Sequence, residues 1–199
     1  MSGTVSNVAT WANADVLIGD LTATAPTLGT AFSATGGLSF LGLVTTDGTT
    51  ESQSNDSTDI SAFVEQGVIA TVRSNLVYTL QVTAMEDSIV NMGLRYDASD
   101  LTAAAGGGVG YSGITKARDL TRKFKIGLQL TSGDLLKQRY TRGHAEIDSI
   151  GDAQESQSGV LQTQVTFKIY ANDSGELWDN FLGSLDDSSS SSSSSSSAA

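Results

Sequence analysis

The chain has 199 residues, enough for one domain with a substantial core plus terminal extensions. It contains no Cys, which excludes disulfides and thiolate metal sites, and its formal net charge of -11 argues against tightly bound nucleic acid, because phosphate contacts require clustered Lys and Arg. Gly, Ser and Thr are abundant. They are mediocre helix formers, so the composition favours β-sheet surfaces and turns.

The N-terminal residues 1–14 are small and polar apart from Trp11, and they predict an arm without a core of its own. They lack the basic start and apolar run of a secretion signal. No stretch of the chain approaches the roughly 20 apolar residues that span a bilayer. We therefore expect a protein that is made in the cytoplasm and has no membrane partner.

The next part of the chain alternates between short apolar runs and polar segments. Residues 15–20 predict a first strand, the Ala-, Thr- and Gly-rich residues 21–37 a loop, and residues 38–44 a second strand. Residues 45–59 contain no apolar side chain, so we expect a long exposed loop there. A loop of this length inside a compact domain is usually functional or disordered. Apolar character returns in residues 60–66.

The clearest alternation follows an apolar run at residues 68–72 and predicts a half-exposed strand over residues 76–84. The side chains expected on its buried face are Leu76, Tyr78, Leu80, Val82 and Ala84.

Beyond this strand the apolar period changes from 2 to 3.6 residues, which predicts a helix of about three turns. Asp87 or Ser88 can cap its N-terminus. Its expected buried face carries Met85, Ile89, Met92 and Tyr96.

The second half begins with a Gly-rich loop, expected over residues 97–115 because it contains the run AAAGGGVGYSG. Residues 116–131 end in a strand that forms a hairpin with a second basic strand at 135–143, since Ser-Gly-Asp at 132–134 supplies the turn. Residues 145–150 predict a further strand. The side chains expected on the buried face of the first strand are Phe124, Ile126, Leu128 and Leu130.

The longest alternating run covers residues 160–171. After a turn at 172–175, residues 176–185 carry Trp178 and Phe181 and are compatible with a short closing helix or turn. Residues 186–199 are a Ser-rich tail that we expect to be disordered. The side chains expected on the buried face of the alternating run are Leu161, Thr163, Val165, Phe167, Ile169 and Ala171.

Together these elements predict a mainly β fold: a β-sandwich or barrel of about eight strands with one flanking helix, long loops and mobile termini. We predict an N-terminal arm at 1–14, one domain at 15–185 with loops at 45–59 and 97–115, and the tail at 186–199.

Charge is distributed in three blocks. Residues 1–100 hold 11 acidic and 2 basic residues, residues 101–145 hold 2 and 8, and residues 146–199 hold 9 and 1. The central basic block is a solvated hairpin face, a DNA contact, or the partner of acidic segments of a neighbouring subunit; the acidity on both sides favours the last. The candidate interface residues are Lys123, Lys125, Lys137, Arg139 and Arg142, with Asp56, Asp59 and Glu65 as their acidic counterparts.

Motifs for catalysis or ligand binding match only in part. Residues 108–113 fit G-x-G-x-x-G, but they follow an Ala/Gly loop and precede a basic strand, whereas a dinucleotide site needs a strand before and a helix after the motif. His144 is the only histidine and no G-x-S-x-G elbow accompanies it. The carboxylates lack EF-hand spacing. We therefore expect no catalytic, cofactor-binding or metal-binding residues, and no enzyme.

The order of elements over residues 12–183 resembles the major tail tube proteins of long-tailed bacteriophages, or siphophages. The resemblance rests on VRSNLVYTLQVTAMEDSIVNMGLRYD at residues 72–97, where an alternating strand runs into the helix, and on the closing stretch VTFKIYANDSGELWDNFLG. The Ser-rich tail has no counterpart in the family pattern.

This resemblance implies a structural virion protein that assembles in the host cytoplasm as stacked hexameric rings. DNA would pass through the lumen during ejection without tight binding, and the tape measure, tail terminator and tail tip proteins would be partners. An acidic chain suits such a conduit, because a lumen of like charge does not trap phosphates. The alternative is a capsid decoration protein or an adhesin-like β binding module on a virion or cell surface.

Overall fold

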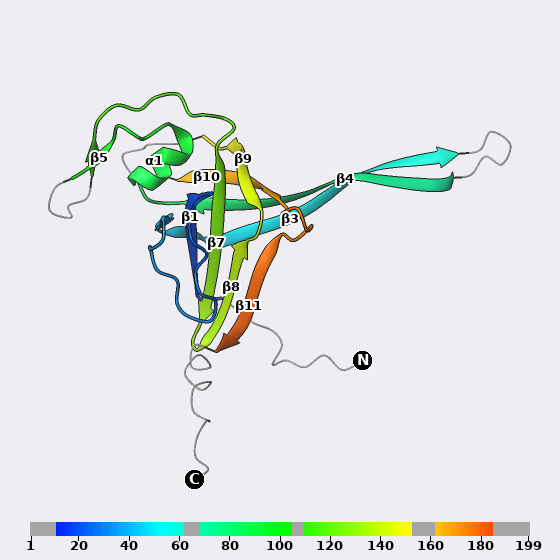
Figure 1. Cartoon of the computed structure of the whole chain (residues 1–199), viewed down its shortest axis with the longest axis horizontal. Helices are drawn as coiled ribbons and strands as arrows, with labels where there is room; N and C mark the ends of the chain where they lie inside the picture. The colour runs from blue at the N-terminus through cyan, green and yellow to red at the C-terminus, as the bar shows by residue number, and fades with distance from the viewer. Residues whose placement is uncertain (1–10, 62–67, 105–109, 153–161, 185–199) are drawn as a thin grey trace, which may run out of the picture.

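The structure is a computed structural model that describes residues 11–61, 68–104, 110–152 and 162–184 (Figure 1). Within these ranges the chain forms eleven β-strands and one short helix. The predicted fold class, mainly β with one helix, is confirmed. The elements are β1 (Asn13–Asp20), β2 (Leu38–Phe40), β3 (Val44–Ser61), β4 (Val68–Ala84), α1 (Ile89–Arg95), β5 (Thr102–Ala103), β6 (Tyr111–Ser112), β7 (Lys123–Ser132), β8 (Leu135–Thr141), β9 (His144–Ile150), β10 (Thr163–Tyr170) and β11 (Trp178–Ser184).

The main sheet has nine strands, and β7 is where its two halves meet. One edge of β7 pairs with β1 along the full length of β1, and β1 in turn pairs with β2. The other edge pairs first with β9 and then with β8, which continue one another around a bend. The strand path is therefore β11-β8-β7-β9-β10-β4-β3, with β1 and β2 attached to β7.

A single large core joins both halves, so the sheet folds over itself in two layers. Fully buried side chains come from β7 on one side, such as Ile126, and from β4 and β10 on the other, such as Leu80 and Phe167. Phe124 and Phe167 meet edge to face with ring centroids 6.3 Å apart. Each apolar side chain of this size contributes about 1.5–3 kcal/mol when it is buried.

The predicted alternation is confirmed in the middle of the strands and fails at their ends. Every described member of the expected inner face of β10 is buried, whereas Ala171, just beyond the strand, is exposed and Leu161 lies outside the described residues. Leu76 was expected on the inner face of β4 but is 53% exposed. It lies where β4 has left the body, so there is no second layer for it to pack against.

The outer face of β7 and β8 is covered by residues 21–37, which contribute Phe32 to a second apolar cluster with Leu17, Leu38 and Tyr140. Gln138 is fully buried, accepts from the Gly29 N–H (2.7 Å) and donates to the Thr30 carbonyl (2.5 Å). Gln129 accepts from the Phe32 N–H (2.7 Å) and from Gln138 (2.9 Å). These two amides hold the covering segment by pairing its backbone groups, which would otherwise be buried without partners.

The prediction of a loop at residues 45–59 is wrong. The segment belongs to β3, which pairs with β4 from Thr49↔Val82 to Ser61↔Val68. Its Thr, Ser and Gln side chains are compatible with a strand that is exposed on both faces. The absence of apolar residues therefore indicated exposure rather than a loop.

The helix is shorter than predicted and buries a different face. Ser88 caps it as expected, accepting from the Asn91 N–H at 3.3 Å. It has seven residues, about two turns, and buries Asn91 and Leu94 in place of the expected face. Met85 instead directly follows β4 and donates its N–H to the Leu43 carbonyl (2.8 Å), and Tyr96 has extended backbone angles at the C-cap.

Two further expectations need correction. Residues 176–185 do not form a closing helix or turn, because β11 pairs with β8 along its whole length, from Trp178↔Thr141 to Ser184↔Leu135. Pairing with β11 satisfies the backbone N–H and C=O groups at the outer edge of β8, which a turn would leave unpaired. The Gly-rich loop contains a small ladder between β5 and β6, and its residues 105–109 lie outside the described residues.

We expect Gln138→Ala to lower the free energy of unfolding by about 3 kcal/mol, because it leaves the Gly29 N–H and the Thr30 carbonyl unpaired and opens a small cavity. Gln164→Ala, at an exposed site on β10, is the matched control and should change stability by less than about 0.5 kcal/mol. Urea unfolding of both variants measures this. Equal effects would show that the buried amides do not hold the covering segment.

Candidate assembly surface

The hairpin of β3 and β4 extends beyond the two-layer body, and we call its described residues 51–61 and 68–79 the arm (Figure 1). Nine consecutive residues of β3, 51–59, are exposed, so both faces of this strand meet solvent. Side-chain pairs link the two strands, with Ser52 and Thr79 oxygens 2.6 Å apart and Thr71 donating to Asp59 at 2.7 Å. A two-stranded ribbon is only marginally stable alone in water, so the arm is suited to packing against another surface.

Two long strands, β3 and β11, end the strand path, and within the described residues each pairs on one side only. An open edge presents unpaired backbone N–H and C=O groups to any strand of another chain. Neither strand contains Pro or Lys, which commonly protect edges, although β3 carries the charged side chains of Glu51, Asp56 and Asp59 and shifts register along its pairing with β4. On β11, Leu182 is 65% exposed. These edges can therefore accept strands from a partner.

Arg139 of β8 ties the root of the arm to the opposite layer. Its guanidinium makes two hydrogen bonds to the Glu51 carboxylate of β3, one of them at 3.2 Å, and donates to Asn180 of β11 at 3.0 Å. It also lies over the Trp178 ring, 4.5 Å from the centroid. The Arg139 side chain is only 16% exposed. A paired, stacked guanidinium of this kind is well ordered, because the planar fork matches the carboxylate.

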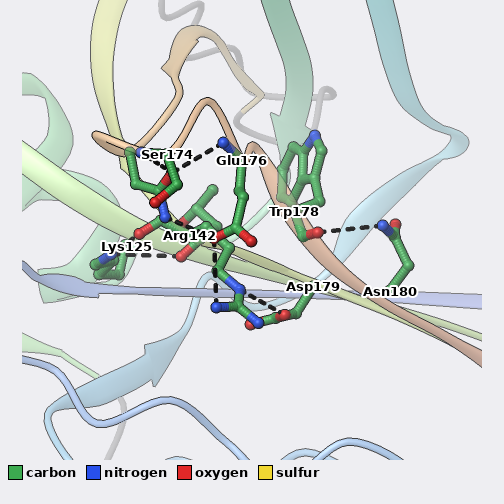
Figure 2. Close-up of polar contacts among 9 residues, drawn as sticks. Lys125, Arg142, Ser174, Glu176, Trp178, Asp179 and Asn180 are labelled. Atoms are coloured by element: carbon green, nitrogen blue, oxygen red, sulfur yellow. Dashed lines mark hydrogen bonds and ion pairs between the residues drawn. The ribbon is translucent and has the colours of Figure 1, made fainter.

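A second ionic cluster fixes the corner where β8 turns into β9 (Figure 2). Arg142 donates to Asp179 at 2.7 Å and lies 3.5 Å from Glu176. The hydrogen bond to Asp179, with the charges of both acids, raises the pKa of Arg142. Lys125 donates to the carbonyl of Arg142 at 2.8 Å and to that of Gly143. Burial lowers the pKa of Lys125, opposed by the charge of Asp179.

The basic residues predicted as subunit-interface candidates therefore have different surroundings. Arg139 and Arg142 pair with acids of their own chain, Lys125 binds backbone carbonyls, and Lys123 lies 3.9 Å from Glu146. For Lys137, the described residues supply no ion-pair partner.

The acidic candidates lie on the arm where they are described. Asp56 and Asp59 belong to its exposed strand, whereas Glu65 lies outside the described residues. Pairing of these acids with the basic block of a neighbouring subunit stays a prediction. The sequence did not reveal Glu51, Glu176 and Asp179 as the intrachain partners, because the segments that carry them were expected to be a loop and a helix or turn.

His144 stacks on Tyr170, with ring centroids 4.8 Å apart, and lies 3.4 Å from Glu146. Among the described residues, no three His, Asp or Glu side chains gather as a group that could hold a metal ion. No helix in the described part of the chain has the length and apolar character needed to cross a membrane.

No protein-family model and no curated protein matches the chain. Among solved structures, the chain is similar to the tail tube of phage SPP1, determined by solid-state NMR and cryo-electron microscopy. The TM-score is 0.32 and the sequence identity 12%, over 86% of this chain and 76% of that one.

We expect Arg139→Lys to lower the free energy of unfolding by about 2 kcal/mol, because Lys keeps the charge but loses the fork to Glu51 and the stacking on Trp178. Amide hydrogen exchange at residues 49–53 should accelerate, since the root of the arm loses its tie. The control is Lys137→Ala, on the same strand and face. Unchanged exchange in Arg139→Lys would mean that strand pairing alone holds the arm.

Proposed function

We propose that this protein is the tail tube subunit of a long-tailed bacteriophage, which polymerises with copies of itself as stacked, hexameric rings around a conduit for DNA ejection. The observation that carries the proposal is the arm: a paired ribbon, exposed on both faces of β3, that extends away from the body. Such a ribbon has no core to stabilise it within one subunit, so a neighbouring subunit is the natural source of its packing.

The open strands β3 and β11 support lateral association in the ring. Pairing of backbone edges between neighbours removes the hazard of uncontrolled strand addition, and a ring that closes leaves no free edge around its circumference. Pairing of edges between subunits also makes the wall of the ring continuous, because each strand lies about 4.8 Å from the next.

Charge supports the conduit. A subunit of net charge -11 presents mainly like charge to DNA, so phosphates slide past without being trapped. Among the described cations, Lys116, Arg139 and Arg142 are each paired with a carboxylate of the same chain and do not offer free phosphate sites. Tape measure, tail terminator and tail tip proteins are the partners of such a tube, and the tail of the virion is its location.

A capsid decoration protein or adhesin-like β module is the second candidate, since exposed strands and polar surfaces also suit those roles. Immunogold labelling of virions separates the two functions. Label along the tail shaft supports the tube, whereas label on capsids supports decoration.

Shortening the arm should abolish tube formation and leave the subunit folded. Ser54 is paired with Val77, so residues 55–76 can be replaced by Asn-Gly to close a shorter hairpin. None of the described side chains in the removed segment is buried, so the urea midpoint should stay close to that of the original chain. Negative-stain microscopy at high concentration, with tail tip complexes as nucleators, measures assembly.

The matched control introduces the same Asn-Gly turn at positions 133–134, between β7 and β8, and leaves the arm intact. This control should form tubes. Tubes of normal length and rigidity from the shortened chain would contradict the role of the arm, and strictly monomeric particles from the unmodified chain would contradict the proposed function itself.

A further inference from the structure

The two layers of the body overlap only in part, and each extends past the other on the face that elsewhere forms the core. In the layer of β1, β7, β8 and β11, directly paired residues form rows that cross the strands. The row through Leu128 and Arg139 is covered, since Leu128 is buried and Arg139 binds Glu51 of β3. In the next row, Leu182 is 65% exposed. The opposite layer therefore ends between these two rows.

We call the uncovered row the ledge, and it consists of one residue from each strand: Ala14, Leu130, Lys137 and Leu182. Leu130 and Lys137 are half-buried, and Lys137 has no ion-pair partner within the described ranges. In Figure 1 the hairpin of β7 and β8 and the end of β11 reach down past β3 and β4. The ledge is therefore a strip of core face, mostly apolar, that lacks an opposing layer.

The layer of β3 and β4 extends past the body in the same way, as the arm. Alternate residues of β4 lose their burial stepwise, since Leu80 is fully buried, Tyr78 is half-buried and Leu76 is 53% exposed. Because side chains on a strand alternate between faces, these three residues share the face through which β4 packs in the core. Leu76 thus continues the core face of its layer at a position where the other layer is missing.

The arm and the ledge are continuations of two faces that already pack against each other within one subunit. Inside the body, β4 contacts β7 through the main core, and Arg139 and Glu51 join the two layers at its boundary. In Figure 1 the arm extends to the right, whereas the strands of the ledge extend downward. The arm therefore leaves the ledge of its own chain uncovered, as the exposure of Leu76 and Leu182 shows. A second copy can supply the layer that each of these surfaces lacks.

Charge is compatible with such a contact and does not drive it. Beyond its root, the arm has Asp56, Asp59 and Arg73 in its sequence, a net charge of -1. The ledge has Lys137, and Asp134 lies in the turn beyond it. Because these charges nearly balance, burial of apolar surface is the main source of affinity. The stem of Lys137 can pack in the contact while its ammonium group stays in water.

We propose that the arm of one copy packs across the ledge of a second copy, with Leu76 of the arm against Leu130 and Leu182 of the ledge. This inference rests on the proposed tube and deepens it by naming the surface that receives the arm. The arm gains the packing that a two-stranded ribbon lacks, and Leu182 is removed from water. Because the arm and the ledge are different surfaces, each copy gives one arm and receives another, so the contact continues from copy to copy.

The chain contains no Cys, so introduced cysteines can report this contact directly. Mild oxidation of tubes formed by the Leu76→Cys, Leu182→Cys double variant should give a ladder of disulfide-linked multimers on a non-reducing gel. A disulfide requires Cα atoms about 4.4–6.8 Å apart, so the ladder reports close approach. Each single variant lacks one side of the contact and should give no ladder. The matched control combines Leu76→Cys with Leu120→Cys, a residue that is 76% exposed in the connection before β7, and should also give none.

Charge insertion at the same positions gives a second measurement. Leu76→Lys and Leu182→Lys each place a second cation beside Lys137 in a contact that excludes water, so each should raise the protein concentration needed for tube formation at least about tenfold. Leu120→Lys is the control and should assemble within about threefold of the original chain. Pelleting and negative-stain microscopy measure assembly, and circular dichroism confirms that each variant is folded.

Tubes of the double cysteine variant that give no ladder would overturn the contact and leave the tube in place. Normal assembly of both lysine variants, or an equal ladder from the Leu120→Cys control, would do the same. If Val8→Cys with Leu182→Cys forms a disulfide within one chain in high yield, while Leu76→Cys with Leu182→Cys gives no ladder, the occupant of the ledge is the N-terminal segment and the proposal is wrong. Absence of tubes from the original chain would instead overturn the proposed function together with this contact.

Discussion

The structure depends on the backbone pairing between β3 and β4, which continues along both strands beyond the last residues that are buried in the core. Leu80 is buried opposite Glu51, and from that pair outwards β3 is exposed at every position through Asp59. Hydrogen bonds between strands are individually worth about 1 kcal/mol net, and they do not replace the hydrophobic term that stabilises a domain. The arm is therefore the least self-sufficient part of the described chain, and its direction has to be set by contacts at its root.

Those contacts come from a few charged side chains on the β8–β9 corner. Arg139 links β8 and β11 to Glu51 at the root of the arm, while Arg142 and Lys125 hold the bend from which β9 continues into the other layer. These residues of the basic block thus make their contacts within the subunit. Its arginines connect layers that the apolar core brings together but does not orient, because hydrophobic burial is non-directional whereas a bidentate pair has a required geometry.

Strand periodicity predicted the core well because burial on one face imposes a period of two. Phe124, Ile126 and Leu128 follow it, as do Val165, Phe167 and Ile169. Prediction failed where burial was absent or came from a distant segment. The polar residues of β3 carry no periodic pattern, β11 is a strand because β8 offers an edge, and Gln129 and Gln138 are buried because residues 21–37 cover them. The ion pairs of the corner depend on these same long-range pairings.

The proposed assembly makes two different demands on one subunit. Lateral contacts must close, and unpaired strand edges meet this demand because backbone groups pair in any neighbour that presents a strand in register. Axial contacts must repeat without closing, which requires two unlike surfaces on opposite sides of the body. Copies with a net charge of -11 also repel one another at long range. Association therefore needs contacts that exclude water, which burial of apolar surface supplies better than a charged surface alone.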